Sequence, residues 1–466
     1  MSQKFNTGYI LRISLVSALG GFLFGYDWVV IGGAKFFYER FFDLVGIPHL
    51  QGLAMSSALL GCIPGALFAG YLSDKIGRKL SLIFAAVLFT FSALGTGLAS
   101  GFTSFMIFRI LGGVGIGLAS CISPIYIAEI SPGKMRGKFV SLNQLNIVIG
   151  ILAAQLTNYL IAREVPAGAT DEFILNSWNG QMAWRWMFLA EIIPAGIFFI
   201  LAFFLPESPR WMVKMDREES ARLTLEKIGG REYAIQLIAE IRESFQDVAQ
   251  KINWSELRKK KVRPILIIGM VLAAFQQWCG INIVFNYAEE VFTSAGFGIS
   301  DALFNIVLTG VVNLIFTLVA IRVVDGWGRR KLMLFGSMGL ALTYLFLGAA
   351  FFLELRGSLV LVIIIIALSV YAMSLAPITW VVLSEIFPNR VRGAAMAVAT
   401  ATLWVASALL VLLFPLIKDW INISGAFWLY AVICIAGFLF IRRRLPETKG
   451  KSLEEIEELL AFSKES

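Results

Sequence analysis

The sequence is poor in charge and in metal-binding residues. Of its 466 residues, 15% are charged, 58% are hydrophobic, and one, His49, is a histidine. A soluble globular chain carries about 25% charged residues, so this composition is typical of a protein that crosses a membrane many times. Cys62, Cys121, Cys279 and Cys434 lie in apolar stretches without the spacing of metal ligands. We therefore expect no metal and no cofactor, and interpret the cysteines as small buried hydrophobic residues.

Apolar runs long enough to cross a bilayer recur along the whole chain. A transmembrane helix needs about 20 mostly apolar residues, and such runs predict an all-α membrane protein with twelve spans in two groups of six. The first run is too long for the apolar core of a signal peptide, about 7–15 residues. The expected spans lie near 9–31, 50–72, 80–99, 103–128, 138–162 and 185–205, then near 264–291, 300–324, 331–353, 359–384, 394–416 and 422–441.

The distribution of basic residues predicts which side of the membrane each connecting segment faces. Basic residues favour cytoplasmic segments, and here they concentrate in alternate segments, for example at 75–79 and 329–331. We place these segments, the region 258–263 and both termini in the cytoplasm, as in a multi-pass protein of the cell membrane. The opposite segments hold fewer basic residues, among which we count Lys35 and Lys418. The net charge of +8 thus indicates topology, and we expect no nucleic-acid partner.

The charged region between the two groups of spans predicts a small cytoplasmic unit. Ala221–Ile228 and Tyr233–Val248 carry apolar residues at helical spacing among charges, which favours short helices over a disordered linker. A region of about 55 residues is short for an independent catalytic fold. We divide the chain into an N-terminal six-helix bundle at 1–206, a cytoplasmic helical linker at 207–262, a C-terminal six-helix bundle at 263–445 and a cytoplasmic tail at 446–466.

The two halves of the chain repeat each other in sequence. The repeated motifs are an acid followed by Gly-Arg-Lys/Arg at 74–79 and 325–330, a glutamate seven residues before an Arg-Gly pair at 129–137 and 385–393, and Pro-Glu-Ser/Thr at 206–208 and 446–448. Three motifs in one order imply a duplicated six-helix unit. A ligand site is then expected between the halves, near the middle of the membrane.

Three uncharged amides stand in the middle of the seventh span, around Gly280. Gln276, Gln277 and Asn282 are costly at this depth unless they face a wet cavity or a polar partner. On a straight helix Gln277 and Asn282 would point about 140° apart. Either the cavity is wide, or the helix loosens at Gly280 and turns both amides inward. Because an amide both donates and accepts hydrogen bonds, this stretch predicts a site for a neutral molecule rich in hydroxyl groups.

On these motifs the chain resembles the sugar porter family of the major facilitator superfamily over nearly its whole length. The matching sequences are Gly-Arg-Lys/Arg at 77–79 and 328–330, Pro-Glu-Ser-Pro-Arg at 206–210, Gln-Gln-x-x-Gly-Ile-Asn at 276–282 and Pro-Glu-Thr-Lys-Gly at 446–450. The family includes bacterial proton-coupled xylose symporters and animal facilitative glucose transporters. The resemblance implies the major facilitator fold, alternating access to a sugar site, and a functional monomer in the lipid bilayer.

The resemblance also implies which residues contact the sugar. The expected substrate-binding residues are Phe24, Gln144, Gln276, Gln277, Asn282, Asn313, Trp380 and Trp404. The chain departs from the family at Leu403, Asn286 and Ala376, where members usually have an amide, a tyrosine and a glycine. These departures leave the particular sugar open, whether a pentose, a hexose or a related polyol.

Two charged residues lie inside predicted spans. Asp27 is deep in the first span, and Arg109 is near the start of the fourth. A charge in the hydrocarbon region is expensive, so each is expected to face the interior and to have a partner. The pair is either a static structural contact or a proton site, in which protonation of Asp27 releases Arg109 and permits the next conformational step. Proton symporters of the family resemble this chain in having aspartate here, whereas facilitators carry asparagine, and on this resemblance we favour symport.

Charged residues of the repeated motifs are expected to form a network on the cytoplasmic side. They are either ordinary solvated charges, worth about 0–1 kcal/mol per pair, or a latch that holds the two halves together when the protein faces outward. The duplicated spacing favours the latch. The expected gate residues are Asp74, Arg78, Glu129, Arg136, Glu207, Arg210, Asp325, Arg329, Glu385, Arg392 and Glu447.

The sequence therefore favours secondary active transport of a neutral monosaccharide, with the proton as the second transported species. Two alternatives remain open: a facilitative uniporter in which the Asp27–Arg109 pair is structural, and a transporter-like sugar sensor. A sensor would be expected to carry a long cytoplasmic tail. An enzyme is disfavoured, because no nucleophile–base pair or metal-ligand cluster stands out. We accordingly expect no catalytic residues.

Overall fold

The computed structural model describes residues 5–166, 168–247, 257, 259, 262–387 and 391–449, with side chains except at 134, 244–247, 324 and 325. These residues form helices and no strand. The first half contains α1 (Thr7–Phe41), α2 (Pro48–Ile76), α3 (Arg78–Gly97), α4 (Phe102–Ile130), η1 (Gly133–Met135), α5 (Arg136–Ile161), α6 (Asp171–Asn176), η2 (Asn179–Ala183), α7 (Trp184–Leu189) and α8 (Ile192–Ala202). After α9 (Pro209–Lys214) and α10 (Glu218–Asp247) come α11 (Arg263–Trp278), α12 (Ile281–Asn286), α13 (Ala288–Ser294), α14 (Ile299–Trp327), α15 (Arg329–Phe352), α16 (Ser358–Met373), α17 (Leu375–Ile386) and α18 (Arg392–Arg444).

Among the described residues, eleven helical segments are long and apolar enough to span a membrane. One of them, α18, contains two predicted spans. As one straight helix its 53 residues would reach about 80 Å, far more than the hydrocarbon core of a bilayer, about 30 Å. The helix instead breaks at Asn422, whose φ is +59°. The eleven segments therefore accommodate the twelve predicted spans, and the all-α membrane fold is confirmed.

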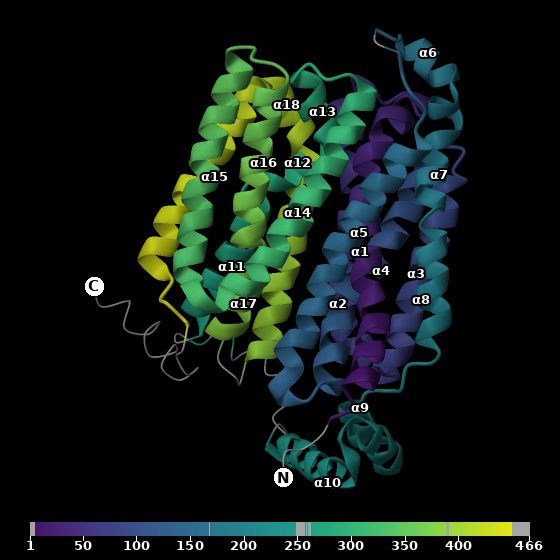
Figure 1. Cartoon of the computed structure of the whole chain (residues 1–466), viewed down its shortest axis with the longest axis vertical. Helices are drawn as coiled ribbons and strands as arrows, with labels where there is room; N and C mark the ends of the chain where they lie inside the picture. Colours follow the sequence, from purple (N-terminus) through teal and green to yellow (C-terminus); the bar gives the residue numbers. More distant parts are fainter. Residues whose placement is uncertain are drawn as a thin grey trace.

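The spans are arranged as two bundles side by side. Figure 1 shows α1–α8 on one side of the molecule and α11–α18 on the other, with α9 and α10 at one end. In the first bundle α1 packs against α5, and α2 and α3 pack against α4. In the second bundle α11 and α15 pack against α18. The bundles meet where α5 contacts α14 and where α2 contacts α18.

Glycines bring α1 and α5 into close contact. A Cβ atom on Gly25 would lie 2.0 Å from the carbonyl oxygen of Ile147, and one on Gly150 would lie 2.0 Å from that of Phe22. Helices in lipid associate by van der Waals packing, which small residues at the crossing improve. The crossing fixes the position of α1, which carries Phe24 and Asp27.

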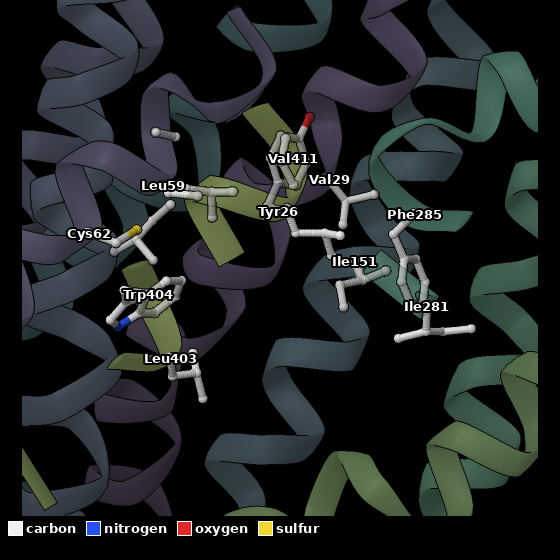
Figure 2. Close-up of a cluster of buried hydrophobic side chains, with 14 of the residues drawn as sticks. Tyr26, Val29, Leu59, Cys62, Ile151, Ile281, Phe285, Leu403, Trp404 and Val411 are labelled. Atoms are coloured by element: carbon white, nitrogen blue, oxygen red, sulfur yellow. The ribbon is translucent and has the colours of Figure 1, made fainter. Parts of the chain in front are cut away.

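Apolar side chains from both bundles fill the space between them. Figure 2 shows Tyr26 and Ile151 of the first bundle in one buried cluster with Phe285 and Trp404 of the second. The rings of Trp28 and Phe285 lie 5.6 Å apart, within the range of favourable aromatic contacts. In this part of the interface the two halves are therefore held together by dispersion between apolar side chains.

The described part of the linker between the bundles is mainly helical, as its sequence predicts. α10 breaks at Gly230, where φ is +85°, and so consists of two helical pieces. Apolar side chains of α9, among them Trp211, pack against Ala221 of α10. The backbone N–H of Asn6 donates to the carbonyl of Ile228 over 2.8 Å, which ties the start of α1 to the linker. Residues 248–256 of the linker lie outside the described part of the chain.

Candidate functional site

The seventh span is broken at Gly280. α11 ends at Trp278, Gly280 has a φ of +91°, and α12 begins at Ile281. A Cβ atom at this position would also lie 2.8 Å from Cβ of Tyr430 in α18. Glycine is thus required both by the backbone conformation and by packing. Of the two arrangements that the sequence leaves open, the structure has the loosened helix.

The break brings the predicted amides into one hydrogen-bonded chain. Asn282 donates from Nδ2 to Oε1 of Gln277 over 2.5 Å, and Gln277 donates to Oε1 of Gln276. Gln276 donates in turn to the hydroxyl of Tyr371, in α16, over 2.6 Å. Asn286, one of the departures from the family pattern, donates to the carbonyl of Asn282 over 2.9 Å. The costly amides are therefore satisfied by each other and by Tyr371, which the sequence analysis missed.

Two of the predicted aromatic residues meet across the bundle interface. The rings of Phe24 in α1 and Trp404 in α18 lie 5.6 Å apart. The indole Nε1 of Trp404 is buried and has no hydrogen-bond partner among the described residues. A buried N–H without an acceptor is costly, and a ligand hydroxyl is one group that would satisfy it.

The remaining predicted residues differ in exposure. Asn313 in α14 is buried, whereas Phe24, Gln144 in α5 and Trp380 in α17 are half-buried. Among the described residues, no hydrogen bond joins Gln144, Asn313 or Trp380 to the amide chain, and their role as sugar ligands stays a prediction. Leu403, another departure, is 2% exposed and lies in the apolar cluster of Figure 2.

Two surface cavities lie away from these residues. One, of about 540 Å³, is lined by residues around α6, and the other, also about 540 Å³, is an apolar hollow beside α7 and α8. Neither cavity touches the amides. In this conformation the amides bind one another, so a ligand would have to replace those hydrogen bonds with its own.

Asp27 and Arg109 form the buried ion pair that the sequence predicts. Nη1 of Arg109 binds Oδ1 of Asp27, and Nη2 donates to the Asp27 backbone carbonyl over 3.1 Å. Both side chains are 1% exposed. The close approach of Asp27 to α4 depends on Gly112 of that helix, since a Cβ atom there would lie 2.7 Å from Oδ2 of Asp27. That Oδ2 atom has no hydrogen-bond partner among the described residues, so it is the position at which a proton would bind.

Glu191 is a third charged residue at this site, and the sequence analysis missed it. It lies between α7 and α8, is 1% exposed, and is subject to the charges of Asp27 and Arg109. Its Oε1 atom has no hydrogen-bond partner among the described residues. The sequence did carry a signal for Glu191, because it is a single acidic residue within the apolar span 185–205, where a charge is expensive. Two carboxyl groups around one guanidinium leave room for a proton on either acid.

The repeated charged motifs form matching structures at the end of each bundle that the sequence predicts to be cytoplasmic. In the first, Arg78 pairs with Asp74 and Glu129, each over 3.0 Å. Glu207 accepts the backbone N–H groups of Arg78 and Lys79 over 2.9 and 3.2 Å, and so caps the start of α3. Burial raises the pKa of Glu207, and these N–H donors oppose that rise.

The second bundle repeats the arrangement. Arg329 pairs with Glu385 over 3.2 Å. Glu447 accepts the backbone N–H groups of Arg329 and Arg330 over 2.8 and 3.2 Å, and caps the start of α15. The side chain of Asp325 lies outside the described part of the chain.

These pairs join residues of the same bundle. Arg136 donates to the carbonyl of Ala128 over 3.1 Å, and Arg392 donates to that of Phe387 over 3.2 Å. Both contacts remain within one bundle, and Arg210 is also engaged in a contact. The latch between bundles stays a prediction for an outward-facing state.

The two caps predict a specific sensitivity to alanine. Gly77 precedes α3 with a φ of +93°, and a Cβ atom there would lie 2.2 Å from Oε2 of Glu207. Gly77→Ala is expected to cost about 1–3 kcal/mol, from the left-handed backbone and the displaced cap, measured as loss of thermal stability in detergent. Gly70→Ala is the control, because a Cβ atom there meets open space within the same helix end. Equal stability of the two variants would contradict the capping role of Glu207.

The whole chain is similar in sequence to a known family of proteins and to individual members of it. The model of a family described as "Sugar (and other) transporter" matches residues 13–460. The chain is 39% identical to the D-xylose-proton symporter of Escherichia coli (strain K12), covering 98% of this chain and 97% of that protein. It is 37% identical to the arabinose-proton symporter of Bacillus subtilis (strain 168), covering 98% and 97%.

The fold also matches a solved structure. The xylose transporter XylE from E. coli in its inward-open conformation superposes with a TM-score of 0.84 at 38% identity. The match covers 97% of this chain and 100% of that one.

Proposed function

The chain belongs to the sugar transporter family, and from this premise we propose that it carries a neutral monosaccharide, a pentose or a hexose, together with a proton. Transport is by alternating access across the cytoplasmic membrane, with both termini in the cytoplasm. The observation that carries the coupling is the buried Asp27–Arg109 pair with its free carboxylate oxygen. One chain supplies both sides of the site, so a monomer suffices.

The sugar site lies between the two bundles. Phe24 of the first bundle meets Trp404 of the second, and the amides of α11 and α12 supply the neutral donors and acceptors. A sugar bound there contacts both bundles, and its hydroxyl groups replace the hydrogen bonds that the amides make with each other. Neutral donors and acceptors suit a hydroxylated ligand and give no counter-charge for an organic anion or amine.

α1 connects the sugar site to the proton site. Phe24 and Asp27 are three residues apart and so lie near one face of that helix. When a proton binds Oδ2 of Asp27, the carboxylate loses its charge and its hold on Arg109 weakens. α1 is then free to shift against α4, and Phe24 moves with it. The same helix therefore responds to both transported species.

Uptake into proteoliposomes tests the proposed function. A panel of labelled pentoses, hexoses and polyols is offered with and without an inward proton gradient. We expect at least one monosaccharide to accumulate above its external concentration only when the gradient is present. Equilibration without accumulation would favour a uniporter, and a panel with no uptake by correctly folded protein would contradict sugar transport.

A further inference from the structure

A buried lysine joins the two bundles at the end opposite the cytoplasmic linker. Lys35 lies in α1 and is 2% exposed, although the sequence analysis had counted it as a loop residue. Its Nζ atom lies 3.0 Å from Glu39 in the same helix, and 3.2 and 2.7 Å from Glu289 and Glu290 in α13. Because α1 belongs to the first bundle and α13 to the second, the two ion pairs with Glu289 and Glu290 cross the bundle interface (Figure 1).

The cluster holds three carboxylates and one cation in close contact with them, the ammonium group of Lys35. Arg40 is 3.9 Å from Glu289 but also pairs with the exposed Asp171 over 2.7 Å. Lys418 of α18 reaches Glu290 only at 4.0 Å. Three carboxylates, of which Glu39 and Glu290 are buried, therefore share one close ammonium group.

The uncharged polar groups around the cluster do not neutralise its excess of carboxylates. Gln51 of α2 donates to Oε2 of Glu39 over 2.9 Å. The hydroxyl of Tyr38 donates to the sulfur of Met55, and that of Tyr287 donates to the carbonyl of Val411. Neither phenol donates to a carboxylate of the cluster.

Two carboxylate oxygens of the cluster are unsatisfied. Oε1 of Glu39 and Oε2 of Glu290 are buried and have no hydrogen-bond partner among the described residues. A buried ionised oxygen without a donor is costly, whereas a protonated carboxyl group lowers the charge and gains an O–H donor. Both oxygens thus indicate a bound proton.

We propose that Lys35, Glu39, Glu289 and Glu290 form an extracellular clasp between the bundles, and that one of the three carboxyl groups binds a proton while the clasp is closed. When α13 moves away from α1, water reaches the acids and the proton leaves. The clasp is distinct from the Asp27 pair, since Lys35 follows Asp27 by eight residues, about 12 Å along the helix. The proposal rests on the proposed function only in assuming that the bundles alternate.

Pulsed electron paramagnetic resonance tests the clasp without requiring transport. Spin labels are placed on cysteines at Val45 and Leu355, exposed positions in the loops after α1 and after α15, and the unsubstituted chain shows any labelling of native cysteines. In Lys35→Met the acids lose their one close cation and those that remain ionised repel each other, so the ratio of closed to open distances is expected to fall by about tenfold or more. Glu172→Gln, at an exposed acid of α6, is the matched control.

A charge swap separates a lost clasp from a damaged fold. The double variant Lys35→Glu with Glu290→Lys keeps one cation among acids and is expected to restore the closed distance. Unchanged distances in Lys35→Met would overturn the clasp, as would failure of the swap in protein that remains monodisperse and as heat-stable as the parent.

The proton is tested by the pH dependence of the same distance. The measurement uses Asp27→Asn and Glu191→Gln with His49→Gln, which removes both acids of the Arg109 site and the one histidine of the chain. If the closed clasp binds a proton, acid favours closure, and the closed fraction should rise severalfold from about pH 8 to about pH 5. Adding Glu39→Gln and Glu290→Gln mimics the protonated acids, so the closed fraction should stay high and lose its pH dependence.

The outcomes of this titration are distinct from those of the uptake assay. A pH-independent distance in the background without Asp27, Glu191 and His49 would overturn the clasp proton. Sugar uptake by the parent protein would be unaffected by that result. Conversely, a working clasp in a protein that transports no sugar would overturn the proposed function alone.

Discussion

Replacing Asp27 with asparagine is expected to abolish uphill sugar accumulation while leaving sugar counterflow intact. Asparagine keeps the size of the side chain next to Gly112, where the structure has no room for a larger group. It removes the charge that binds Arg109 and the oxygen that would accept a proton. The variant should therefore exchange sugar but no longer couple it to the proton gradient.

The size of this effect follows from the gradient. For one proton per sugar, each ~59 mV of proton-motive force supports about a tenfold concentration ratio. At ~120 mV the parent should reach a ratio of about 100, and the variant should stay near 1. Both ratios are measured with labelled D-xylose and D-glucose in proteoliposomes.

Asp301→Asn is the matched control for this substitution. It makes the same chemical change at an exposed residue in the first turn of α14, and accumulation should persist. Counterflow by Asp27→Asn reports that the protein is folded and binds sugar. Accumulation that survives in Asp27→Asn would refute proton coupling through this residue and would leave the buried pair a structural contact.

Replacing Asn282 or Gln277 with alanine is expected to weaken sugar binding by about tenfold to a hundredfold. The two side chains bind each other across the break at Gly280. Loss of either amide removes a donor and an acceptor from the ligand and leaves a buried partner unsatisfied, which costs about 1–3 kcal/mol. A change of 1.4 kcal/mol is about tenfold in affinity.

Equilibrium binding of D-xylose and D-glucose in detergent measures this change. Asn146→Ala is the control, because that amide lies in a span but donates to the carbonyl of Leu142 in its own helix. Affinities of both amide variants within about twofold of the parent would show that the cluster is structural and that the sugar binds elsewhere.

Much of the fold could be predicted from the sequence because lipid acts on each segment separately. A run of apolar residues spans the membrane whatever its neighbours are, so hydropathy located the spans of α1 and α14 without knowledge of packing. The cost of burying charge and amides likewise marked Asp27, Arg109 and Gln277 as residues with partners, and the structure confirms that each has one.

The partners themselves were harder to predict. Glu191 is near Asp27 only because α7 and α8 fold back beside α1. Tyr371 binds Gln276 across 95 residues of sequence, and no local pattern connects them. Lys35 was assigned to a loop because hydropathy ended the first span near residue 31, whereas α1 continues to Phe41 and buries the lysine against α13.

The sequence by itself determined that this chain is a duplicated membrane protein and that certain amides and charges lie inside its membrane spans. Hydropathy, the repeated motifs and the cost of desolvating a polar group can each be read from a single segment. The tertiary structure alone decided how those groups meet. It turned Asn282 toward Gln277 through the backbone of Gly280, admitted Asp27 beside Gly112, and placed Lys35 among acids of the other bundle. These arrangements depend on which helices touch, and that is set by the packing of the whole chain.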